Sequence, residues 1–211
     1  MESKGLRWVP YIGVLALMVS IGTLAEAPAP VHLRGVINDY PVSTDATGTA
    51  TGPWELRGPW SLELHPRSAT ADFSAALTME ISDLTVGAGA ITDTRRQHTH
   101  HISMTGATAV ENPPQSDCPT GITPYPTYTW QLEVTGMATV AGNGGSPFGM
   151  PVPLQVCIGG GPDIEYSNIT LVFAKLASGA PSPATYHFGA QAIHGVVRFA
   201  RSSDDRDEDQ H

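Results

Sequence analysis

Apolar and polar residues alternate along two consecutive runs of the chain, 54–64 and 69–82. The apolar side chains occupy even positions in the first run and, after the polar link 65–68, odd positions in the second. A period of two on both sides of a short link that contains a proline predicts a β-hairpin with one buried face. The expected register pairs Trp60 with Phe73, Leu62 with Ala71 and Leu56 with Leu77.

The same alternation recurs in six further segments: 31–37, 98–106, 128–140, 152–158, 164–173 and 191–199. A slip of the apolar phase predicts a β-bulge near Ser167 and Asn168, and residues 177–185 are expected to form a loop. With about eight strands and no helix needed between them, the pattern predicts one all-β antiparallel domain. A small β-barrel is favoured over a two-sheet β-sandwich, because several strands are long and the first and last have matching patterns that would let them pair.

Composition supports this fold and divides the chain into three parts. The 211 residues include 22 Gly and 18 Pro, and 15% are charged, which is typical of many short strands and turns. Residues 1–25 resemble a secretory signal peptide, with Lys4 and Arg7 ahead of an uncharged segment, 8–25. Residues 26–200 form the predicted β domain, and 201–211 an acidic, disordered tail. The protein is therefore expected to be secreted or periplasmic; the alternative is an N-terminal membrane anchor with the domain outside the cytoplasm.

The formal net charge is −9, and removal of the leader takes away Lys4, Arg7 and Glu2 and makes it more negative by one. This charge argues against nucleic acid as a partner and against stable membrane association after signal cleavage. The two cysteines, Cys118 and Cys157, are expected to form a disulfide in an oxidising compartment. It would close a loop of about 40 residues and stabilise the fold by roughly 3–4 kcal/mol.

A dense polar segment, 95–104, contains three histidines. Alternation turns His98 and His100 toward the interior and His101 outward. Two imidazoles at this spacing lie about 6–7 Å apart at their Cα atoms and can chelate one zinc or copper ion. A third ligand would have to come from elsewhere, with His65 and His187 as candidates. The His-x-His pattern resembles that of copper-zinc superoxide dismutases and of the CHRD domain over this motif alone. The Gly-rich metal loop of the dismutases is missing, so none of their residues is carried over.

Two functional hypotheses follow. The first is an exported, non-catalytic domain that binds a small apolar ligand or acts at the cell surface, with Trp54, Trp60, Phe73 and Trp130 as the ligand-binding residues. An eight-stranded barrel holds one small ligand or is filled by its own side chains. The alternative is a metal-dependent or acid/base enzyme, of the cyclase or isomerase type, that uses His98 and His100.

Overall fold

The computed structural model describes residues 28–41, 54–81, 97–114, 118, 129–142, 148–161, 164–173, 178, 182–189 and 191–202. The predicted leader, 1–25, lies outside these residues. The predicted tail does so beyond residue 202.

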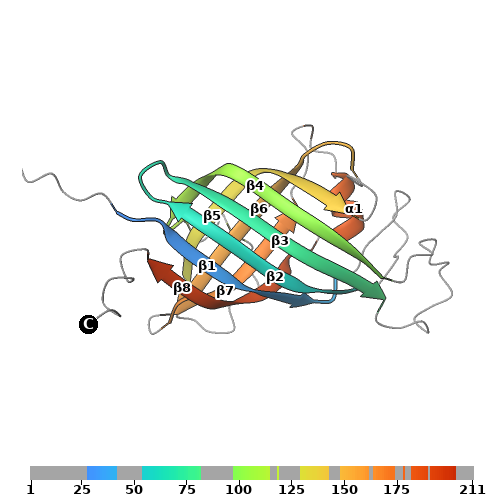
Figure 1. The fold of residues 1–211 in the computed structure, drawn as a ribbon, viewed down its shortest axis with the longest axis horizontal. Coiled ribbons are helices and arrows are strands. Elements are labelled where there is room, and N and C mark those ends of the chain that lie inside the picture. Colours follow the sequence, from blue (N-terminus) through green and yellow to red (C-terminus); the bar gives the residue numbers. More distant parts are fainter. Residues whose placement is uncertain are drawn as a thin grey trace, which may run out of the picture.

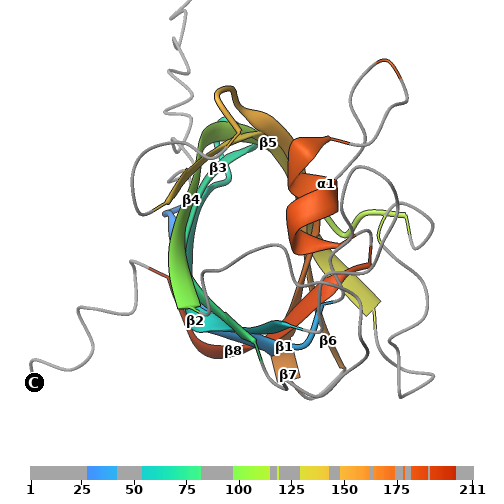
Figure 2. The same ribbon diagram turned by 90° about the vertical axis from the view of Figure 1, so that its right-hand side faces the viewer.

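Eight antiparallel strands form a closed barrel in which each strand pairs with the next along the chain (Figure 1). The pairing of the first strand with the last closes the barrel, as Figure 2 shows from one end. The predicted β-barrel and its closing pair are therefore confirmed, and closure leaves no unpaired sheet edge. The elements are β1 (Val31–Asp39), β2 (Trp54–His65), β3 (Thr70–Ile81), β4 (Gln97–Glu111), β5 (Thr129–Gly142), β6 (Val152–Gly161), β7 (Ile164–Phe173), α1 (Pro183–Phe188) and β8 (Ile193–Ser202).

Alternate side chains of every strand fill the barrel and pack into one hydrophobic cluster. This follows from the period of two, which sends successive side chains to opposite faces. The largest fully buried side chains are Phe73, Phe188, Leu33, Ile37, Leu56, Leu62, Leu64, Leu77, Met79, Ile102, Leu132 and Leu154.

The β2–β3 hairpin has the predicted buried face but a different register. Trp60 lies opposite Ala75, and Leu62 lies opposite Phe73, so the expected Trp60–Phe73 pair is wrong by two residues. The expected register needs a two-residue turn at Pro66 and Arg67, whereas turns of that length in hairpins require positive φ angles that proline cannot adopt. The chain instead uses residues 66–69 as the turn. A shift of two leaves the same side chains inside, which is why the buried face was still predicted correctly.

Gly35 shows how tightly the β1 side of the barrel is packed. It lies opposite Trp60, and a Cβ atom placed on it would overlap the carbonyl oxygen of Val196 and come within 2.8 Å of the Trp60 indole nitrogen. Glycine at this position therefore allows the indole to lie against the β1 backbone.

The pairing of β6 with β7 contains a predicted irregularity. The β6–β7 register shifts between Gly159 and Gly161, and Tyr166 has a positive φ of 52°, so the predicted bulge in this strand is confirmed.

The short helix α1 was not predicted, since 177–185 was expected to be a loop. β8 extends to Ser202, two residues into the predicted tail. In the described part of the chain, no helix has the length and apolar character needed to cross a membrane.

The predicted disulfide between Cys118 and Cys157 is present. Both cysteines are buried and pack with Trp130 in a small cluster separate from the main core. A buried disulfide of this kind is typical of proteins that fold in an oxidising, extracellular-type compartment.

Candidate metal centre

β4 carries two buried histidines, as its alternation predicts. His98 and His100 are 4% and 3% exposed, while His101 between them is exposed to solvent. On the neighbouring strand β3, Met79 lies opposite His98 and Leu77 opposite His100. The two imidazoles therefore stand on an apolar interior wall, where polar groups are tolerated when a partner satisfies them.

A third histidine, His187, reaches the same place from α1. The helix begins at Pro183, and the Ser182 side chain caps it by accepting a backbone N–H. A helix of six residues has little stability by itself, so packing must hold it. Phe188 provides that packing: it is fully buried and stacks on Phe173 of β7 with ring centroids 4.5 Å apart. This anchor places the preceding residue, His187, beside the β4 pair.

The three imidazoles converge through one nitrogen each. His187 Nε2 lies 2.8 Å from His100 Nε2 and 3.2 Å from His98 Nε2. The rings stand at 53° to 89° to one another, so they surround a common point instead of stacking. Among the described residues, these three form the group of possible metal ligands, with ligand atoms within 4.8 Å of one another.

Hydrogen bonding explains this arrangement poorly. A neutral imidazole nitrogen carries either one hydrogen or one lone pair, directed along a single line in the ring plane. His187 Nε2 is at hydrogen-bonding distance from two other Nε2 atoms, yet it can make one well-aligned bond with them. The second contact then has to share the hydrogen or the lone pair that the first contact uses.

A metal ion would accept one lone pair from each of the three histidines at once. Zn–N bonds of about 2.0–2.1 Å in tetrahedral geometry place neighbouring nitrogens about 3.3 Å apart. The observed separation of 3.2 Å between His187 and His98 is close to this value, and that of 2.8 Å between His187 and His100 is shorter. Imidazole nitrogen is a good ligand for zinc, copper, nickel and iron, so the donor set is compatible with the zinc or copper ion that the spacing of His98 and His100 allows this pair to chelate.

Aromatic rings enclose the three histidines. Trp54, at the start of β2, meets the His98 ring edge-on at 5.4 Å. Phe188 contacts both His100 and His187 at 5.0 Å, and Phe148 meets His187 at 5.8 Å. A charged ion bound at this place would have a largely apolar shell, which would strengthen its interaction with the ligands.

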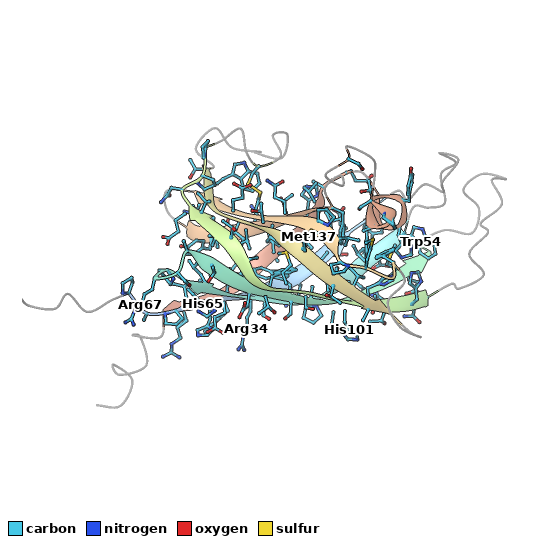
Figure 3. The ribbon with its side chains drawn as sticks, turned by 90° about the horizontal axis from the view of Figure 1, so that it is seen from above. Arg34, Trp54, His65, Arg67, His101 and Met137 are labelled. Carbon is cyan, nitrogen blue, oxygen red and sulfur yellow. A yellow bond between two sulfur atoms is a disulfide. The ribbon has the colours of Figure 1, made fainter. Side chains whose placement is uncertain are left out.

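The other candidate metal ligand, His65, lies far from this group. It ends β2 at the hairpin tip, whereas Trp54 begins the strand at the opposite end of the barrel (Figure 3). His65 Nε2 is 3.5 Å from the Asp72 carboxylate and its Nδ1 is 4.0 Å from that of Glu63. His65 is therefore part of a surface cluster of charges at that tip.

The four aromatic residues predicted to bind a ligand do not form one site. Trp54 lies at the histidines, while Trp60 and Phe73 stack on each other inside the core with centroids 6.4 Å apart. Trp130 belongs to the disulfide cluster. Sequence analysis missed Phe148 and Phe188.

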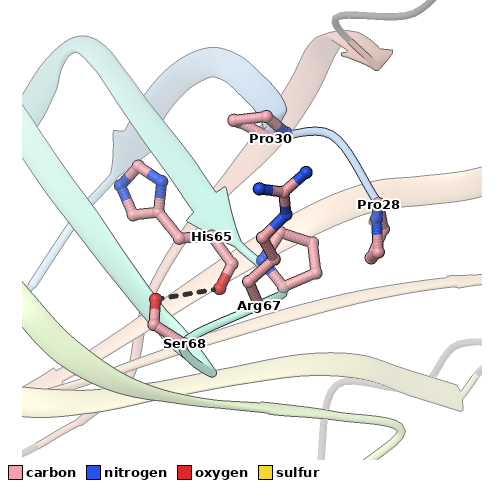
Figure 4. Close-up of a pocket in the computed structure, with 6 residues that line it drawn as sticks. Pro28, Pro30, His65, Arg67 and Ser68 are labelled. Atoms are coloured by element: carbon pink, nitrogen blue, oxygen red, sulfur yellow. Dashed lines mark hydrogen bonds between the residues drawn. The ribbon is translucent and has the colours of Figure 1, made fainter. Parts of the chain in front are cut away.

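A pocket of about 370 Å³ lies at the hairpin tip, away from His98, His100 and His187 (Figure 4). Its lining combines the tip with the segment before β1: Pro28, Pro30, His65, Pro66, Arg67 and Ser68. The Ser68 hydroxyl donates to the His65 carbonyl oxygen at 3.3 Å, a contact that stabilises the turn.

A second polar group joins the two strands that close the barrel. Asp39, the last residue of β1, accepts hydrogen bonds from the backbone N–H of Tyr40 and, at 2.7 Å, from that of His194 in β8. The His194 Nδ1–H donates to the same carboxylate oxygen at 2.9 Å. Burial alone would raise the pKa of Asp39, but these hydrogen bonds together with the nearby His194 hold it below its ordinary value. The ionised carboxylate therefore fastens β1 to β8.

Comparisons of the chain with protein-family models, curated proteins and solved structures found no match.

Proposed function

We propose that this protein is an exported β-barrel that binds a zinc or copper ion through the Nε2 atoms of His98, His100 and His187. The observation that carries the proposal is the convergence of three imidazoles, each with one nitrogen within 4.8 Å of the other two, in an otherwise largely apolar place. Two histidines of β4 and one histidine of α1, 87 and 89 positions later in the sequence, meet there. β4 is held by the barrel, and α1 is held by the packing of Phe188 on Phe173.

Metal binding is favoured over the carrying of an apolar ligand inside the barrel. The inward side chains of all eight strands pack against one another in one cluster, with most members at 0–2% exposure. This is the packing of a barrel filled by its own residues. The aromatic residues first expected to hold a ligand contribute to that core, to the disulfide cluster or to the shell around the histidines.

Export is supported by the disulfide and by the composition of residues 1–25. We expect the mature protein to be secreted or periplasmic and to begin at residue 26. Intact-mass measurement of protein recovered from outside the cytoplasm tests this, and recovery of the uncleaved chain in the membrane fraction would support the anchored alternative.

The test of metal binding is calorimetric titration of the metal-free protein with Zn²⁺ and, separately, Cu²⁺, together with elemental analysis of the purified protein. One ion should bind per chain, and at a hundredfold excess over Kd it should stabilise the fold by about 2.7 kcal/mol. Because His98 and His100 are buried, the primary variant is His187→Ala, which changes a partly exposed residue of a short helix.

His101→Ala is the matched control, since it removes an exposed histidine from the same strand. The His187→Ala protein should fold, as judged by circular dichroism, but lose the metal-dependent stabilisation, while His101→Ala should retain it. Equal binding by the wild type and His187→Ala would overturn the proposal.

A further inference from the structure

The metal site is unevenly enclosed. His98, His100, Trp54 and Phe188 are all buried, with exposed fractions of 4% or less. His187 and Phe148 are partly exposed. The barrel wall and the α1 anchor therefore close the site on the β4 side, and among the described residues its partly exposed side is formed by Phe148 and His187.

The donor set leaves coordination capacity. Structural zinc sites are usually closed by four protein ligands, whereas catalytic sites have three and hold water or substrate at the fourth position. The described residues place three nitrogens at this site, and one of the three belongs to the partly exposed residue. Three histidine ligands next to a partly exposed side of the site match the catalytic type of zinc site, in which one coordination position is open.

The rings along the approach select the type of molecule that fits. Phe148 lies 5.8 Å from His187 and 6.2 Å from Phe188, at interplanar angles of 65° and 67°. Aromatic rings prefer such edge-to-face contacts, so the approach favours a flat, apolar body over a hydrated one. A molecule that combines an aromatic ring with one nitrogen or oxygen donor satisfies both the metal and these walls.

We propose that the metal ion keeps a coordination position which is reached past Phe148 and His187 and binds a small aromatic molecule with a nitrogen or oxygen donor, an inference that rests on the proposed metal site. The exchangeable position makes the site a binding centre for such a molecule, in contrast to a purely structural metal. Phe148 is the residue that determines specificity, because it is partly exposed and its ring contacts the ring of His187.

The test uses the protein loaded with Co²⁺, whose visible spectrum reports changes in coordination. Benzimidazole is the aromatic donor probe, and azide is a donor of similar reach without an apolar body. Both should change the cobalt spectrum. Phe148→Ala should weaken benzimidazole binding about two- to tenfold and leave azide binding unchanged, as expected from the loss of aromatic contact.

Met150→Ala is the matched control, since Met150 is an exposed apolar residue two positions away. A cobalt spectrum that responds to neither probe, with the metal still bound, would overturn the open position. Equal weakening of both probes by Phe148→Ala, or no weakening of either, would overturn the aromatic selection. If the protein binds no cobalt, zinc or copper, the result refutes the proposed metal site itself and not only its open coordination position.

Discussion

Reduction of the Cys118–Cys157 disulfide is expected to remove a large share of the stability of the barrel. The two cysteines are 39 residues apart in sequence. Closing a loop of that length restricts the unfolded chain, and the chain-entropy relation gives about 4 kcal/mol at 25 °C. Domains of this kind are usually stable by about 5–15 kcal/mol, so the reduced protein should be marginal.

The measurement is urea unfolding of the oxidised and reduced wild-type protein, followed by tryptophan fluorescence. Reduction retains both sulfur atoms, so the packing with Trp130 changes little and the comparison isolates the covalent link. Because the effect lies mainly in the unfolded state, reduction should slow folding and leave the unfolding rate nearly unchanged.

The Cys118→Ala, Cys157→Ala double variant is a second comparison, and it should lose somewhat more because it also removes buried atoms. A difference of less than about 1 kcal/mol between oxidised and reduced protein would refute the loop-entropy reasoning. It would mean that residual structure already holds the two segments together in the reduced unfolded chain.

Three further predictions concern packing and pH. Gly35→Ala should lower the free energy of unfolding, measured with urea, by about 1–3 kcal/mol because its Cβ has no room. Gly161→Ala, whose Cβ meets nothing within 4 Å, should lower it by less than about 1 kcal/mol. Equal effects of the two substitutions would contradict the packing argument. The lowered pKa of Asp39 contributes stability that is present above the ordinary carboxyl pKa and is lost as pH falls through the folded-state value. The free energy of unfolding should therefore fall less steeply on acidification in Asp39→Asn than in the wild type, and identical slopes would contradict this. Phe188→Ala should lower the free energy of unfolding by about 3–5 kcal/mol because it removes a buried ring. It should also weaken Zn²⁺ binding in calorimetry, because Phe188 anchors α1 and thereby positions His187. Unchanged zinc affinity would show that His187 is held in another way.

The fold could be predicted because one-faced alternation is a local property of each strand. It determined which side chains of β4 point inward, including His98 and His100, and it indicated barrel closure through the matching patterns of the first and last strands. It did not determine the hairpin register, since two registers that differ by two residues bury the same face. The incompatibility of Pro66 with a two-residue turn was the information that distinguishes them.

The third histidine could be named from the sequence but not located. His187 reaches the site because α1 packs on β7 through Phe188, a tertiary contact that no periodicity encodes in a six-residue helix. The signal that was available was Ser182 followed by Pro183, which is a common start of a helix. Phe148 lacks even that signal, because its place beside His187 rests on a tertiary contact between residues far apart in the sequence.

The pairing of β1 with β8 has a consequence for when the protein can fold. These strands lie at opposite ends of the described chain, and the bond between Asp39 and His194 fastens them together. The barrel consequently cannot close until β8 has been synthesised, and until then the partly paired sheet has two open strand edges. Late closure suits a chain that crosses a membrane before it folds, and it makes loss of the final strand more damaging than loss of any surface loop.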